Sequence, residues 1–150
     1  MTTSLEGGPF YVTAEEVEKL VQEFDRCTLP RERWTHAAHL TVALLYILRY
    51  SWPHALELIR AGLQRYNAAC GIITTAQSGY HETMTIFWML MVRRYLSNLS
   101  ASERSLVVIA NNLIANYGSK HLPLEYYSRD TLMSPEARKR WVEPDLKAID

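Results

Sequence analysis

The sequence predicts an all-α fold, a compact single-domain bundle of about five main helices followed by a short C-terminal helix. Apolar residues recur at helical spacing in long segments, and residues that favour helix starts and stops separate these segments. No stretch of any length shows the alternation of apolar and polar residues that is typical of a strand. The 150 residues fit one domain without internal repeats or linkers, so we expect a single unit over residues 1–150.

The first three helices are each expected to open at a residue that favours a helix start. In chain order these openings are Thr13, which forms a capping box with Glu16, then Thr35, then Pro53. The corresponding ends are Leu29-Pro30, Tyr50 and Gly71. Residues 1–12 precede the first opening and are expected to form a flexible N-terminus.

The later elements follow a change of pattern at residues 72–79, "IITTAQSG", whose β-branched and small polar residues suit an extended loop. The fourth helix is expected from Tyr80 onward, through "YHETMTIFWMLMVRRYL". The fifth is expected to begin at a capping box of Ser100 and Glu103 and to end at Gly118. After a long connection resembling a strap over one end of the bundle, Ser134-Pro135-Glu136 opens a short last helix that Glu143-Pro144 ends.

Composition excludes several classes of partner. The chain has 16 basic and 16 acidic residues and therefore no net field to attract nucleic acid or an anionic membrane. Cys27 and Cys70 match no CxxC spacing and are expected to be reduced thiols in a cytoplasmic protein. The longest apolar run, "LTVALLYIL", is too short to span a bilayer. No heptad seam assigns an oligomeric state.

Three histidines form a candidate metal site. His36 and His39 lie three residues apart and therefore on one face of the second helix. His81 is expected in the first turn of the fourth helix, where the helix dipole keeps an imidazole neutral and able to bind metal. If the two helix openings meet, these side chains could hold a divalent zinc, iron or manganese ion. Taken one at a time, each histidine is more often a half-buried residue with one satisfied hydrogen bond.

Glu82 follows His81 directly and is a candidate fourth ligand, general base or carboxylate that orients an imidazole. Adjacent helical residues point about 100° apart, so Glu82 is not an equal partner of His81. A carboxylate in a first helical turn also stabilises the helix dipole without any function, and this alternative stands equal to the others.

Further residues could line the same site. Tyr66, Asn67 and Trp88 are candidates for binding a substrate, with ordinary core and C-cap roles as the alternative for the first two. Tyr80 and Arg129 are candidates for stabilising developing negative charge, although Arg129 could equally pair with a neighbouring acid. Trp34 is expected as a wall beside the histidines, and "RKRW" at 138–141 as a solvated face.

The segments "WTHAAHL", "YNAACGI", "GYHETMTIFW" and "YYSRDTLMSPEARKRWVEPDL" resemble an uncharacterised family of small bacterial helical proteins. The likeness covers most of the chain from about residue 30 onward and implies a bacterial origin and a single domain. A looser likeness, in ligand number and fold class, is to DinB-like helical bundles, which gather three histidines around a divalent metal. The order of the HxxH spacing and the His-Glu pair differs from that family, so its ligand roles do not transfer.

Together these features predict a metal-dependent enzyme, of hydrolase or oxygenase type, that acts on a small molecule. A metal-bound hydroxide would be the nucleophile and Glu82 would manage its proton. Two alternatives stay open. One is a non-enzymatic module that binds a small ligand or a partner, and the other is metal-free acid/base catalysis by His81 and Glu82.

Overall fold

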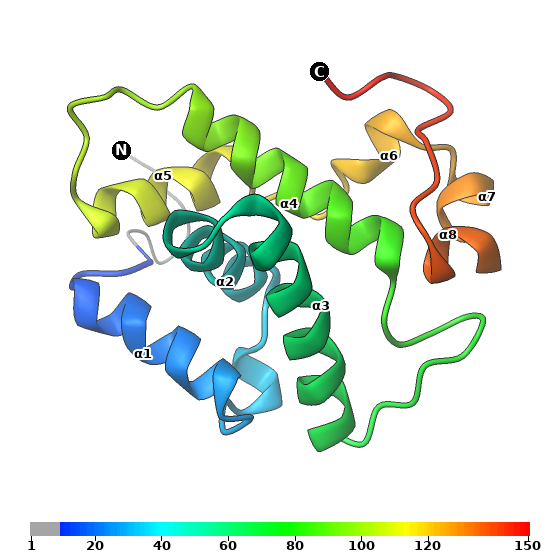
Figure 1. Ribbon diagram of the computed structural model, residues 1–150, viewed down its shortest axis with the longest axis horizontal. Helices are drawn as coiled ribbons and strands as arrows, with labels where there is room; N and C mark the ends of the chain where they lie inside the picture. The colour runs from blue at the N-terminus through cyan, green and yellow to red at the C-terminus, as the bar shows by residue number, and fades with distance from the viewer. Residues whose placement is uncertain (1–9) are drawn as a thin grey trace.

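The computed structural model describes residues 10–150, and this part of the chain is helical with no strand, which confirms the predicted all-α fold (Figure 1). The longer helices are α1 (Ala14–Asp25), α2 (His36–Arg49), α3 (Trp52–Ala69), α4 (Glu82–Ser97) and α5 (Leu106–Tyr117). The short ones are the 3-10 turn Arg31–Arg33, α6 (Pro123–Tyr126), α7 (Arg129–Leu132) and α8 (Pro135–Lys139). None of the described helices combines the length and hydropathy needed to cross a membrane.

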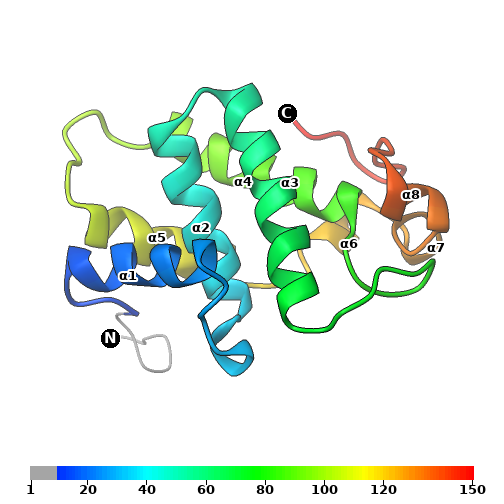
Figure 2. The ribbon, with the colours of Figure 1, turned by 60° about the horizontal axis from the view of Figure 1, so that its bottom comes forward.

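Helix α2 lies at the centre of the bundle and packs against α1, α3, α4 and α5 (Figure 2). Its sequence "HAAHLTVALLYILR" is apolar on almost every side, which is typical of a helix surrounded by others. Eight of its side chains are buried, namely Ala38 and the seven from Leu40 to Tyr46. The opening of α2 is consequently fixed from several directions, and its two histidines are held by the core.

The chain just before α1 is anchored to the bundle through Tyr11. Residues 1–9 of the predicted flexible N-terminus lie outside the described part of the chain. Tyr11 is held: its backbone N–H donates to Oδ1 of Asn111 at 3.0 Å, and its carbonyl accepts from Nδ2 of the same residue at 2.9 Å. Its hydroxyl bonds Oγ1 of Thr41 at 2.7 Å.

Predicted helix openings are right for α1 and α2 and wrong for two later helices. The capping box of Thr13 and Glu16 is present, and Thr35 caps α2. His81 is the N-cap of α4, in extended conformation, so it lies before the helix and not in its first turn. Helix α5 begins at Leu106, and its cap is Ser105. The expected cap, Ser100, lies five residues earlier in the chain.

A second layer covers one side of α4. The segment expected as a long connection folds into α6 and α7, and the predicted short last helix, α8, packs on α4 (Figure 1). Phe87 and Met91 of α4 form a small core with residues of this layer, which are Tyr126, Tyr127 and Leu132. The last helix ends at Lys139, earlier than predicted, because Arg140 turns to an extended conformation. This layer brings residues of α7 and α8 next to the opening of α4.

Candidate functional site

A cavity of about 500 Å³ lies where the opening of α2, the second half of α3 and the opening of α4 meet. We call it the histidine pocket. Its polar lining residues are His36, His39, Asn67, Gly79, Tyr80, His81, Thr85, Lys120 and Arg138. Its apolar lining residues are Trp34, Ala43, Ile59, Leu63, Met84, Trp88, Met89 and Met133. A volume of this size is ordinary for a small-molecule site.

His36 ties two helices together. Its Nε2 lies 3.1 Å from the carbonyl oxygen of Tyr117, the last residue of α5. A carbonyl at a helix end lacks an intrahelical donor, so the imidazole N–H donates to it and satisfies it. The ring meets the edge of Trp88 at a centroid distance of 4.5 Å. His36 therefore has a structural duty, and its Nδ1 has no hydrogen-bond partner within residues 10–150.

His81 has both ring nitrogens engaged. Nδ1 accepts from the backbone N–H of Met84 at 3.1 Å, which makes the imidazole the cap of α4. Nε2 lies 2.8 Å from the carbonyl oxygen of Leu132, the last residue of α7, and must donate to it. These two bonds fix the neutral Nε2–H tautomer and leave no lone pair for a metal.

His39 keeps one ring nitrogen, Nε2, available to a ligand. Its Nδ1 donates to the carbonyl oxygen of Thr35 at 2.8 Å, within its own helix. Its ring stacks on Trp34 with centroids 3.8 Å apart. Nε2 makes no hydrogen bond to any described residue, so in the neutral ring it is an unused acceptor.

All three imidazoles favour the neutral form, which the sequence predicted for His81 through the helix dipole, and burial is the main cause. Burial lowers the pKa of His39 to about 4, against the opposing effect of its hydrogen bond to Thr35. Burial also lowers the pKa of His36, helped by the nearby charge of Lys120. The pKa of His81 is lowered by burial and then by the charge of Arg138.

The histidines line one cavity without forming a metal cluster. No group of three or more His, Cys, Asp or Glu side chains within residues 10–150 is spaced to hold a metal ion. The predicted zinc, iron or manganese site thus gains no geometric support here and stays a prediction. Of the three predicted metal ligands, His81 is the least able to bind an ion, because both of its ring nitrogens already form hydrogen bonds.

Glu82 does not line the histidine pocket. Its Oε2 accepts from Nε of Arg60 at 2.7 Å, and its Oε1 accepts from the hydroxyl of Tyr80 at 2.5 Å. The three side chains belong to a neighbouring depression between α3, the loop before α4, and α8. Burial and the bond to Glu82 raise the pKa of Tyr80. The Glu82 carboxylate is therefore already paired with Arg60 and with the Tyr80 hydroxyl, and these bonds have a structural role.

The remaining candidates separate into those that line the pocket and those that do not. Asn67 and Trp88 line it, and the side chain of Asn67 has no hydrogen-bond partner among the described residues. Tyr66 is 1% exposed and donates its hydroxyl proton to the carbonyl oxygen of Leu29 at 2.7 Å, which makes it a core residue. Arg129 is exposed on α7 and does not line the pocket.

Two pocket residues, Arg138 and Lys120, are absent from the site predicted from the sequence. The segment "RKRW" was expected to be a solvated face, yet Nη1 of Arg138 donates to the carbonyl oxygens of Gly79 at 2.9 Å and Tyr80 at 3.3 Å. The only sequence signal is that Arg138 follows Ala137, the buried residue of a very short helix. Lys120 lies in the connection between α5 and α6, where no periodicity indicates which side chain faces inward.

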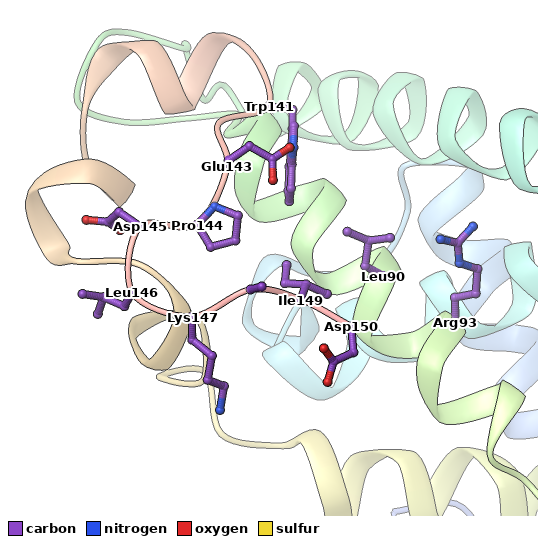
Figure 3. A pocket seen from close by; sticks show the side chains of 11 residues that line it. Leu90, Arg93, Trp141, Glu143, Pro144, Asp145, Leu146, Lys147, Ile149 and Asp150 are labelled. Atoms are coloured by element: carbon purple, nitrogen blue, oxygen red, sulfur yellow. The ribbon is translucent and has the colours of Figure 1, made fainter.

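A second hollow of about 500 Å³ has a different character (Figure 3). Leu90 and Arg93 of α4 line one side, and Trp141 and residues 143–150 line the other. It contains no histidine, and its acidic and basic side chains are mixed. The histidine pocket is the stronger candidate because several helices build it and its polar groups converge.

Comparison of the chain with protein-family models, with curated protein sequences and with solved structures returns no significant match. The resemblance to a family of small bacterial helical proteins therefore stays a prediction. The geometry of the histidine pocket is the basis for assigning a function.

Proposed function

We propose that the chain binds a small, largely apolar molecule in the histidine pocket, with His39 offering Nε2 as a hydrogen-bond acceptor. The observation that carries this proposal is the pocket itself, a cavity of about 500 Å³ with aromatic and methionine walls and a few convergent polar groups. This combination is typical of small-molecule sites, in which apolar walls supply affinity and a few polar groups fix orientation.

The walls support an apolar ligand body. Trp88 and Trp34 are only partly buried, so each keeps an aromatic surface that the protein core does not cover. Met84 and Met133 add flexible, polarisable side chains that adapt to the shape of a ligand. Contact with such surfaces gains about 25 cal/mol for each Å² of apolar area removed from water.

The polar groups support a defined orientation. His39 Nε2 and the amide of Asn67 have no hydrogen-bond partners among residues 10–150, and both line the pocket. A ligand hydroxyl or N–H that donates to His39 would satisfy a nitrogen that the fold leaves open. The same nitrogen could accept a proton in catalysis, although a pKa of about 4 makes it a weak base at neutral pH.

A metal-dependent hydrolase or oxygenase is the second candidate, favoured by the open ring nitrogens of His36 and His39. These residues lie three apart at the opening of α2 and both line the pocket. Elemental mass spectrometry of tag-free protein tests this candidate, with a His36→Ala, His39→Ala double variant as control. Near-stoichiometric metal that the variant loses would establish it, and no uptake on reconstitution would exclude it.

Ligand binding is tested by blocking the pocket. A fragment library of small apolar molecules is screened by ¹H–¹⁵N correlation spectra, and hits are expected to shift the amide signals of lining residues such as Asn67 and Thr85. In Asn67→Trp an indole fills the cavity, and these shifts should disappear. Ala68→Trp places the same indole on the exposed neighbouring position and should leave them intact. Shifts that persist in Asn67→Trp, or no hits at all, would overturn the proposal.

A further inference from the structure

The charged residues around the histidine pocket are all of one sign. Arg138 and Lys120 line it, and no Asp or Glu does. The chain as a whole carries equal numbers of acidic and basic residues, so this local excess is not a reflection of composition. Glu82 lines the neighbouring depression, which Arg138 also borders, and its carboxylate is bound by Arg60 and Tyr80.

Arg138 has unused hydrogen-bonding capacity. Nη1 serves the backbone carbonyls of Gly79 and Tyr80, whereas Nη2 makes no hydrogen bond to any described residue. Nε is enclosed by protein atoms and has no partner. Because Nε is closed off by the protein and Nη1 is already used, Nη2 is the nitrogen of Arg138 that can donate to a ligand carboxylate.

A charged donor forms a stronger hydrogen bond to an ionised acceptor than to a neutral one. The ion pairs within residues 10–150 join Arg33, Arg49, Arg60, Arg140 and Lys147 to acidic residues, and they include neither Arg138 nor Lys120. Lys120 is exposed at the rim of the pocket, near enough to His36 for its charge to act on that ring. Within residues 10–150, both cationic side chains of the pocket are therefore without an acidic partner.

We propose that the ligand of the histidine pocket is a small apolar carboxylate, whose carboxylate group accepts hydrogen bonds from Arg138 while Lys120 supplies a second positive charge at the rim. This inference rests on the proposed function, since it specifies what kind of small molecule the pocket takes. The apolar body packs against Trp88 and the methionines. The neutral imidazoles of His36 and His39 each add an open ring nitrogen without adding charge.

Three probes of similar shape test the charge preference: 1-naphthoate, 1-naphthalenemethanol and 1-naphthylmethylamine. Their dissociation constants are measured by isothermal titration calorimetry at pH 7.5 and low ionic strength. Naphthoate is expected to bind at least about tenfold more tightly than the alcohol, because a charge-assisted pair adds about 1.4 kcal/mol or more. The amine is expected to bind most weakly.

Arg138→Gln should remove most of the preference for naphthoate and change the affinity for the alcohol less than about threefold. Arg140→Gln, which removes a charge from an exposed side chain two residues away, should leave all three affinities unchanged. Lys120→Gln is the second variant, since an exposed side chain can be replaced without affecting folding. It should weaken naphthoate binding by a smaller factor and in a salt-dependent way.

The outcomes distinguish the two proposals. Equal binding of naphthoate and the alcohol, unaltered by Arg138→Gln and Lys120→Gln, would overturn the carboxylate inference and leave the small-molecule pocket standing. A preference for the amine would do the same. Failure of all three probes to bind would overturn both.

Discussion

Nδ1 of His81 accepts a hydrogen bond from the backbone N–H of Met84 at 3.1 Å, so an imidazole caps α4 where Ser, Thr, Asp or Asn is usual. The same ring reaches the carbonyl oxygen of Leu132 through Nε2 at 2.8 Å. One side chain thereby satisfies a donor at the opening of α4 and an acceptor at the end of α7. The histidine pocket depends on this connection, because it holds the second layer against the opening of α4.

Replacing His81 should therefore destabilise the fold. His81→Ala loses the cap and the bond to Leu132, and we expect a loss of about 2 kcal/mol in the free energy of unfolding. His81→Asn keeps a capping oxygen and should recover about 1 kcal/mol of that loss. Urea unfolding at pH 7.5, followed by circular dichroism, measures both values.

The control for this pair is His54→Ala, at an exposed histidine near the start of α3. It should change the free energy of unfolding by less than about 0.5 kcal/mol. Equal losses for His81→Ala and His81→Asn would contradict the capping role and attribute the whole effect to the bond with Leu132.

Gly79 and Gly71 provide a matched pair of backbone substitutions. Both have positive φ, +89° and +76°, which costs a residue with a Cβ about 1 kcal/mol or more. At Gly79 an added Cβ would also lie 2.5 Å from Cα of Thr74, whereas at Gly71 it would meet nothing within 4 Å. We expect Gly71→Ala to cost about 1 kcal/mol and Gly79→Ala about 3 kcal/mol.

Because the Gly79 carbonyl accepts from Arg138, Gly79→Ala should also weaken binding of a carboxylate probe. Urea unfolding gives the two stabilities, and calorimetry with 1-naphthoate gives the affinities. Similar stabilities for the two variants would show that the backbone of the loop at 72–81 can shift at little cost in free energy. The loop would then not hold the wall of the pocket in place.

The opening of α5 offers a test of a cap that the sequence misplaces. Ser105 accepts from the backbone N–H of Val108 at 3.2 Å, and Ser105→Ala should cost about 1 kcal/mol. Among residues 10–150, the Ser100 hydroxyl bonds only Ser102 within an exposed turn, through its backbone N–H at 3.3 Å and its hydroxyl at 2.9 Å, so Ser100→Ala should cost less than about 0.5 kcal/mol. Thermal unfolding of both variants ranks the two sites, and a larger effect at Ser100 would contradict the assignment.

The error at α5 shows why helix openings are harder to predict than helix faces. Ser100 and Glu103 have the spacing of a capping box, but Glu103 instead accepts from the N–H of Ser105 at 3.0 Å. Both motifs satisfy local backbone donors, and only packing decides between them. The buried residues Ile109 and Leu113, by contrast, lie at helical spacing, and that spacing alone fixes the face they share.

The same distinction applies to the candidate site. His36, His39 and His81 were expected to meet because the openings of two helices would lie together, and all three line one cavity. Their hydrogen bonds could not be predicted, since the carbonyls of Tyr117 and Leu132 that take up two of the rings come from segments distant in the sequence. Arg138 was missed for the same reason: its partners lie 58 and 59 residues away.

The pKa of His39 predicts how stability depends on pH. Burial lowers it to about 4, while an unfolded chain has an ordinary histidine pKa of about 6.5. Between these values the unfolded state binds a proton that the folded state does not, so stability falls as pH decreases from about 6.5 towards 4. The pKa values of His36 and His81 are lowered too, and they act in the same direction. The lowered carboxyl pKa values of Glu16 and Asp145 act only at more acidic pH, below their ordinary values of 4.5 and 3.8.

At pH 5 the contribution of His39 amounts to about 2 kcal/mol. The free energy of unfolding, measured by urea titration at pH 7.5 and 5.0, should therefore fall by at least this amount in the wild-type protein. His39→Gln has no proton to take up in the unfolded state, so its loss between the two pH values should be smaller by about 2 kcal/mol. His54→Gln, at an exposed histidine, should keep the wild-type slope. Parallel pH profiles for wild type and His39→Gln would mean that the His39 ring is solvated well enough to be protonated in the folded protein, and Nε2 would then be a donor to a ligand below pH 6.5 instead of an acceptor.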